Sequence, residues 1–318
     1  MIQRFFQTKS FVLLIYMGMA ALAYYQVFFF RHTLQWDAID CFLAWRHAVV
    51  ELIRDGQLPL WNANAYLGFP LFADPECGAW YPVLWIFSAF GNYDFYSLAA
   101  EWCLHTIIAG MGMHVLVKQL GASRSAAFIA GISFMCSGMY VSNAQNFIYL
   151  IGISWFPWVM AAVRNMFEKL SIKSALVASL TVYMMFSGSY PGITIIAFYA
   201  LLVYVGYVVF YRRREWTDRL QRRRWLITVA TFGFSSAILC ALVLVPVAYA
   251  MPWITRTQGL GAEKILENPL SLKAMVSFVF PFAVGDKQVN WGSDFSMLNA
   301  YVGLFTLMLA GVGIFFAD

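Results

Sequence analysis

The sequence has few charged residues, and this scarcity excludes an ordinary soluble domain. Only 12% of its 318 residues are Asp, Glu, Lys or Arg, whereas a soluble globular domain carries about 25%. Hydrophobic residues make up 61% of the chain. They come in blocks of about 20 residues, the length at which a helix spans the bilayer core. Because these blocks lack the alternation of a membrane β-strand, we expect an all-α, polytopic integral membrane protein.

Basic residues are missing from the short loops on one side of the expected bundle. Loops 142–146 and 188–190 hold no Lys or Arg, whereas seven arginines gather within 212–224. Cytoplasmic loops are enriched in Lys and Arg, so we expect a cytoplasmic N-terminus and extracytoplasmic segments at 31–94 and 251–296. We interpret the net charge of +5 as this topological signal and expect no nucleic-acid partner. The membrane helices are expected near 11–30, 95–117, 125–141, 147–163, 173–187, 191–211, 225–250 and 297–317.

Cysteine is also scarce, and the five cysteines show no zinc-site spacing. Cys41 and Cys77 both fall in segment 31–94, where they could pair in an oxidising compartment. The chain stops at Asp318, directly after the last apolar block. We therefore expect residues 1–318 to form a single transmembrane domain, the N-terminal part of a longer protein.

Segment 31–94 is far longer than a simple link between two helices requires, which argues for a function. From Asp37 to Asp55 its residues follow a helical period. Such an amphipathic helix, just outside a membrane, should lie in the interface plane. The apolar face holds Ile39, Phe42, Leu43, Val49, Val50 and Ile53, and the polar face holds Asp40, His47, Glu51 and Arg54.

Arg46 interrupts the apolar stripe of this helix. One interpretation is snorkelling, in which the aliphatic stem stays on the apolar side while the guanidinium reaches the surface. The other is a guanidinium that holds a phosphate group at the membrane surface. The sequence leaves both interpretations open.

The acidic residues of the segment have two interpretations each. Asp37 and Asp40, at i and i+3 near the membrane edge, could supply a general base for an acceptor hydroxyl or bind a divalent cation. Alternatively, Asp37 caps the helix and favours its dipole. Asp74 and Glu76 are open to the same roles, with an Asp-Pro turn as the structural alternative.

Glu101 and His105 lie one helical turn apart inside an expected membrane helix. Ionisable residues are costly in the bilayer and are usually functional or paired. The sequence therefore predicts either a functional pair or a structural Glu–His pair. The second outer segment adds mixed charge around Arg256, Lys264 and Asn299.

Several motifs, taken together and in order, resemble the YfhO-like family of bacterial membrane proteins. The most specific are Gly56-Gln57-Leu58-Pro59-Leu60-Trp61-Asn62 and Ala73-Asp74-Pro75-x-x-Gly78-x-Trp80-Tyr81-Pro82. The other matches are Asp37-x-x-Asp40, Gly68-x-Pro70, His105 with Ala109-Gly110-x-Gly112-Met113, Gln145, Trp155-x-Pro157-Trp158, Gly188-x-Tyr190-Pro191 and Asn299-x-Tyr301-x-Gly303. The resemblance runs along nearly the whole chain.

This resemblance implies a glycosyltransferase of the type C fold in the bacterial inner membrane. Such an enzyme transfers a sugar from a polyprenyl-phosphate lipid to a cell-envelope glycan or protein outside the cytoplasm. It implies that Asp37 or Asp40 is the general base, with Asp37 preferred. Donor or acceptor contacts are expected from Arg46, Asp74, Glu76, Glu101, His105, Gln145, Arg256, Asn299 and Tyr301. The rival hypotheses are a lipid or polysaccharide transporter or flippase, and a non-enzymatic envelope assembly protein.

Overall fold

The computed structural model describes residues 9–65, 67–213, 218–253, 272–284, 298 and 301–316. The described residues form twelve α-helices and no β-sheet, with a single antiparallel bridge between Asn62 and Phe69. The helices are α2 Lys9–Ala23, α3 Tyr25–Phe28, α4 Ala44–Arg54, α5 Pro82–Ser88, α6 Phe95–Gln119, α7 Arg124–Met135, α8 Gly138–Ser142, α9 Phe147–Lys169, α10 Ile172–Gly188, α11 Pro191–Arg212, α12 Arg219–Ala250 and α14 Leu304–Phe316.

Five helical stretches of the described chain are long and apolar enough to cross a membrane, which indicates a multi-pass membrane protein. They are Phe95–Gln119, Arg124–Ser142, Phe147–Lys169, Pro191–Arg212 and Arg219–Trp253. Three shorter apolar helices occupy the other expected spans, at Ser10–Ala23, Ile172–Gly188 and Leu304–Phe315. Each of the eight expected segments therefore contains a helix, and five of these reach spanning length.

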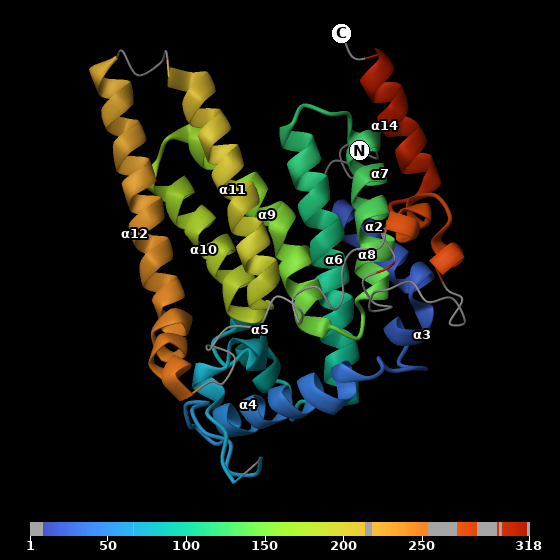
Figure 1. Cartoon of the computed structure of the whole chain (residues 1–318), viewed down its shortest axis with the longest axis vertical. Helices are drawn as coiled ribbons and strands as arrows, with labels where there is room; N and C mark the ends of the chain where they lie inside the picture. Colours follow the sequence, from blue (N-terminus) through green and yellow to red (C-terminus); the bar gives the residue numbers. More distant parts are fainter. Residues whose placement is uncertain are drawn as a thin grey trace.

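The membrane helices stand side by side, and the segment after the first helix covers one end of the bundle (Figure 1). At the opposite end the basic loops meet. Arg164 Nε donates to the Gln119 carbonyl at 3.2 Å, and Arg212 Nη1 donates to the Phe167 carbonyl at 2.6 Å. The alternation of basic and non-basic loops expected from the sequence thus corresponds to two ends of one bundle.

Glycines allow the helices of the bundle to approach closely. A Cβ added at Gly131 of α7 would lie 2.6 Å from the Gly110 carbonyl of α6 and 2.1 Å from Tyr16 Oη of α2. A Cβ at Gly112 would lie 2.6 Å from the Trp158 ring of α9. Gly110, Gly112 and Gly131 thus have the role that small residues often have between membrane helices, which is to let the backbones approach closely.

Two expected helices are broken in the structure. The helix expected at 11–30 is interrupted at Tyr24, whose hydroxyl donates to the Met135 carbonyl at 2.6 Å. The helix expected at 125–141 divides into α7 and α8 at Ser137, whose side chain accepts a hydrogen bond from the Tyr140 N–H and so caps α8. At the second break a side-chain cap takes the place of a main-chain hydrogen bond of the helix.

The amphipathic helix expected at Asp37–Asp55 is present and lies across the end of the bundle (Figure 1). It begins as a π-helical turn, Ala38–Leu43, and continues as α4. Phe42, Val49 and Val50 of its apolar face are buried, whereas the polar face is exposed, as expected. Short 3-10 helices follow at Leu71–Ala73 (η2) and Pro75–Cys77 (η3).

Of segment 251–296, the structure describes three further 3-10 helices: Met251–Trp253, Leu272–Phe278 and Pro281–Val284.

Candidate functional site

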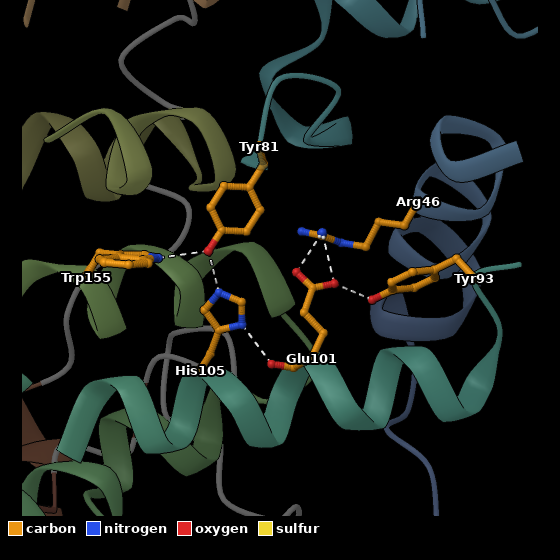
Figure 2. Close-up of polar contacts among 6 residues, drawn as sticks. All are labelled: Arg46, Tyr81, Tyr93, Glu101, His105 and Trp155. Carbon is orange, nitrogen blue, oxygen red and sulfur yellow. Dashed lines mark hydrogen bonds and ion pairs between the residues drawn. The ribbon is translucent and has the colours of Figure 1, made fainter. Parts of the chain in front are cut away.

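A fully buried ion pair joins α4 to α6. Arg46 Nη1 donates to Glu101 Oε1 at 3.0 Å and to Oε2 at 3.2 Å, and the two side chains are 1% and 0% exposed. Tyr93, just before α6, donates its hydroxyl to Glu101 Oε2 at 2.5 Å. His47, the residue after Arg46, bonds through Nδ1 to the Tyr93 carbonyl at 2.8 Å. Arg46, Glu101, Tyr93 and His47 thus form a closed set of contacts, called the α4–α6 clasp below (Figure 2 shows its first three members).

A second buried chain of hydrogen bonds lies beside the clasp (Figure 2). His105 Nδ1 lies 2.7 Å from the Glu101 carbonyl oxygen, and His105 Nε2 lies 2.6 Å from Tyr81 Oη. Trp155 Nε1 donates to the same Tyr81 oxygen at 2.8 Å. Because a carbonyl accepts only, the ring proton sits on Nδ1, and Nε2 accepts the Tyr81 proton. The chain therefore holds His105 in one neutral tautomer and ties the loop to α6 and α9.

These contacts correct two sequence interpretations. Snorkelling is wrong for Arg46, because its guanidinium is buried against Glu101 and lies 4.7 Å over the Phe147 ring. A structural side-chain pair between Glu101 and His105 is also wrong, because His105 bonds to the Glu101 main chain while the carboxylate holds Arg46. Among the described residues, Arg46 Nε and Nη2 have no hydrogen-bond partner. The Arg46, Glu101 and His105 side chains reach no solvent here, so they position the loop and do not present a surface to a ligand.

Three carboxylates lie within electrostatic range of Cys41, near the start of the helix that runs from Ala38 to Arg54, which is called the interface helix below. Burial raises the pKa of the Cys41 thiol, and the negative charges of Asp37, Asp40 and Glu76 raise it further. Asp37 and Asp40 come from the π-helical turn, and Glu76 comes from η3. These residues are called the outer carboxylates below. Asp37 and Asp40 are exposed, so an approaching hydroxyl could reach them.

The backbone before Asp37 is held in an unusual conformation. Trp36 has a φ of 53°, in the left-handed region that bulky residues rarely adopt. Asp37 stands directly before the π-helical turn, yet its side chain accepts no capping hydrogen bond. The helix-cap interpretation of Asp37 is therefore not supported. Strained backbone of this kind is often found at functional sites.

Asp74 follows its structural alternative, a turn before proline. Its side chain accepts a hydrogen bond from the Glu76 N–H at 2.8 Å and caps η3. Burial raises the pKa of the Asp74 carboxyl, while the hydrogen bonds from Glu76 and Cys77 oppose that rise.

Cys41 and Cys77 are both free thiols in this structure. In the part of the chain that is described, no three His, Cys, Asp or Glu side chains come together as a metal site.

An apolar groove of about 460 Å³ lies between α9, α10, α11 and α12. Its lining is almost entirely hydrocarbon and uses residues 182–189, 191–201 and 236–247, the halves of α10, α11 and α12 nearer the outer segment. Pro75 of η3 also lines it. The groove therefore meets the outer segment between Asp74 and Glu76. The sequence gives no signal for this groove, because its walls come from four separate helices.

The remaining predicted site residues are more scattered. Gln145 lies in the short turn between α8 and α9, half-buried. The Tyr301 carbonyl accepts from the Gly138 N–H at 2.5 Å, which places Tyr301 beside α8. Arg256, Lys264 and Asn299 lie outside the described residues. No role is expected from the sequence for Tyr81, Tyr93 or Trp155. Tyr81 and Trp155 belong to motifs given above, whereas Tyr93 belongs to none.

No protein-family model, curated protein or solved structure matches this chain.

Proposed function

We propose that this protein is a glycosyltransferase of the type C fold. It transfers a sugar from a polyprenyl-phosphate donor to a cell-envelope acceptor on the outer face of a bacterial inner membrane. The proposal is supported by the apolar groove reaching η3, whose Glu76 lies within electrostatic range of Cys41, as Asp37 and Asp40 also do. Pro75 lines the groove, and the next residue, Glu76, acts electrostatically on Cys41 together with Asp37 and Asp40.

A lipid-linked sugar needs such a meeting point. Its hydrocarbon tail requires an apolar channel at membrane depth, and its sugar must reach a base at the membrane edge. The groove supplies the first requirement, and Asp37 and Asp40 supply the second. The resemblance of the Asp74-Pro75 and Leu58-Pro59-Leu60-Trp61-Asn62 motifs to YfhO-like proteins supports the same assignment.

The reaction is a displacement at the anomeric carbon. The acceptor hydroxyl oxygen forms a bond to this carbon, and its proton passes to the carboxylate of Asp37 or Asp40. The bond from the anomeric carbon to the phosphate oxygen breaks, and its electron pair leaves with the polyprenyl phosphate. A single displacement inverts the configuration of the sugar. Developing charge on the leaving phosphate requires a nearby cation, for which Arg256 and Lys264 are the candidates from the sequence.

The α4–α6 clasp serves this chemistry from a distance. It fixes α4 against α6 and so sets the position of the π-helical turn that carries Asp37 and Asp40. A base misplaced by about 1 Å can cost about 100-fold in rate. A rigid, dehydrated anchor is thus a suitable support for a base that is itself exposed.

The test is sugar transfer in proteoliposomes supplied with polyprenyl-phosphate-hexose. The variants are Asp37→Asn and Asp40→Asn, with the exposed Asp55→Asn at the end of α4 as the charge-matched control. Loss of a general base should reduce transfer by about 100-fold or more, with Asp37 the preferred base, while Asp55→Asn keeps wild-type transfer. Transfer that survives replacement of both Asp37 and Asp40 would refute this mechanism.

A lipid flippase is the second candidate, because the apolar groove between α9, α10, α11 and α12 could also carry a lipid tail. A flippase would move a labelled polyprenyl-phosphate lipid between leaflets without transferring its sugar. It would also tolerate Asp37→Asn. The same proteoliposomes therefore separate the two functions. A non-enzymatic assembly protein would show neither transfer nor lipid movement.

A further inference from the structure

A second groove lies along α4, separate from the apolar groove. Its lining contains a larger share of polar surface than that of the apolar groove, and it is called the polar groove below. Its volume is about 480 Å³, within the range of about 300–1,000 Å³ that is usual for small-ligand sites. One wall is the polar face of α4, with His47 and Glu51. The others are the turn at Asn62–Ala65 and the start of α6 at Asp94 and Phe95.

The walls of this groove are held in place by internal bonds. His47 is anchored to the Tyr93 carbonyl at 2.8 Å, and Tyr93 belongs to the α4–α6 clasp. Asn62 pairs with Phe69 through both main-chain hydrogen bonds, and its side-chain oxygen accepts from the Asn64 N–H at 2.9 Å. Asp94 caps α6 by accepting from the Ser97 N–H at 2.9 Å. The groove is therefore formed before any ligand arrives, which lowers the entropic cost of binding.

Several polar groups in the groove remain available to a ligand. Within the described residues, neither the Glu51 carboxylate nor the Asn64 side-chain amide has a hydrogen-bond partner. Both side chains are exposed. With its Nδ1 proton donated to Tyr93, a neutral His47 offers Nε2 as an acceptor. Beside these groups lie apolar surfaces of Ile39, Leu43 and Phe95, the last 50% exposed.

The charge of the lining selects among ligand classes. The described lining contains no Lys or Arg, and its charged members are the carboxylates of Glu51 and Asp94. Phosphate and sulfate groups would be repelled here. Hydroxyl groups, in contrast, can donate to a carboxylate and accept from an amide, while a sugar's C–H face packs on apolar side chains.

We propose that this groove binds a neutral, hydroxyl-rich oligosaccharide, and that this oligosaccharide is the acceptor of the transfer reaction. The assignment as acceptor rests on the proposed function; the binding of a neutral glycan does not. The polar face of the interface helix begins in the π-helical turn with Asp40, about one turn before Ala44 at the groove wall. A glycan lying in the groove therefore extends toward the outer carboxylates.

The first test measures binding alone, with purified wild-type protein in nanodiscs and saturation-transfer NMR. The probes are maltotetraose, cellotetraose and N-acetylated chitotetraose, with a glycerol-phosphate oligomer as the anionic probe. At least one neutral probe should bind saturably and the anionic probe should not. Glu51→Gln and Asn64→Ala should each weaken that binding by about tenfold, the effect of losing one good hydrogen bond. Asp55→Asn, outside the groove, should leave it unchanged.

The groove assignment would be overturned if no neutral probe bound saturably. It would also be overturned if the wild type, Glu51→Gln, Asn64→Ala and Asp55→Asn proteins bound the neutral probe equally well. Preferential binding of the glycerol-phosphate oligomer would overturn it as well. The transfer assay then separates this result from the proposed function. Glycan binding without sugar transfer would refute the glycosyltransferase function but retain the groove as a glycan-binding site. Sugar transfer that is insensitive to Glu51→Gln and Asn64→Ala would retain the glycosyltransferase function but refute the groove as the acceptor site.

Discussion

Arg46 and Glu101, 55 positions apart in the sequence, face each other in a fully buried ion pair, with Arg46 Nη1 3.0 Å from Glu101 Oε1. This pair fastens an interface helix to a membrane helix. Asp37, Asp40 and one wall of the polar groove lie on the interface helix that this pair fastens. The pair is thus a natural target for testing how the outer segment is held.

Breaking the pair on one side should be strongly destabilising. Arg46→Gln or Glu101→Gln leaves an uncompensated buried partner and should cost about 3–5 kcal/mol. Replacing both by apolar residues, Arg46→Met with Glu101→Leu, should recover much of this loss. Thermal unfolding in detergent measures the effect. Arg54→Gln, on the exposed face of the same helix, is the control and should change the midpoint little; equal losses for Arg46→Gln and Arg54→Gln would contradict the role of the clasp.

Close packing of α7 on α6 should make the stability of the protein sensitive to replacement of Gly131. A Cβ at Gly131 would meet Tyr16 Oη and the Gly110 carbonyl at 2.1 and 2.6 Å, so Gly131→Ala should destabilise by about 1–3 kcal/mol. Gly206 on α11 has no atom within 4 Å of its added Cβ. Gly206→Ala should therefore be neutral or stabilising by up to about 1 kcal/mol. Unfolding midpoints of the two variants compare them directly, and a tolerated Gly131→Ala would show that the helices are farther apart.

Asp74 should make stability depend on pH in the opposite sense to a salt-bridged carboxylate. Burial raises the pKa of Asp74 in the folded state, so folding favours its protonated form. The stability that this shift contributes to the folded protein is fully present below the ordinary Asp pKa, and it is lost as the pH rises through the raised pKa of Asp74. Asp74→Asn keeps the cap acceptor, and should raise the unfolding midpoint at pH 7 but not at pH 4. A midpoint lowered at pH 7 would indicate that the ionised carboxylate has a stabilising partner.

The proposed orientation predicts which residues are reached from each side. In a cysteine-free background, a membrane-impermeant maleimide should label Asp55→Cys in intact spheroplasts. It should label Arg222→Cys in the basic loop region only after permeabilisation. Both positions are exposed, so accessibility in the folded protein does not distinguish them. The reverse pattern would invert the topology and place the outer carboxylates in the cytoplasm.

Periodicity and hydropathy predict the elements well, because both follow from local sequence. The interface helix, its buried Phe42, Val49 and Val50 and its exposed Glu51 are as expected. Arg46 could not be interpreted correctly, since its burial depends on Glu101, which belongs to another helix. The hydrogen bond from the Tyr24 hydroxyl to the Met135 carbonyl likewise joins two helices that the sequence alone does not place together.

The parts of the site that the sequence does not predict are those assembled from distant elements. Tyr93 carries no motif, yet it connects His47 to Glu101. The apolar groove has walls from four helices, and each wall resembles any lipid-facing surface when considered alone. The carboxylates Asp37, Asp40 and Glu76 are candidates from their residue types alone, but the electrostatic effect of all three on Cys41 depends on the fold.

The Arg46–Glu101 pair also constrains how the protein is made. Arg46 leaves the ribosome 55 residues before its partner, so the nascent interface helix carries an unmatched positive charge while α6 is still being synthesised. That charge must stay hydrated until α6 enters the bilayer, because an unpaired guanidinium is too costly to bury. The outer segment can therefore dock only after the second membrane helix has been inserted, which gives its maturation a fixed order.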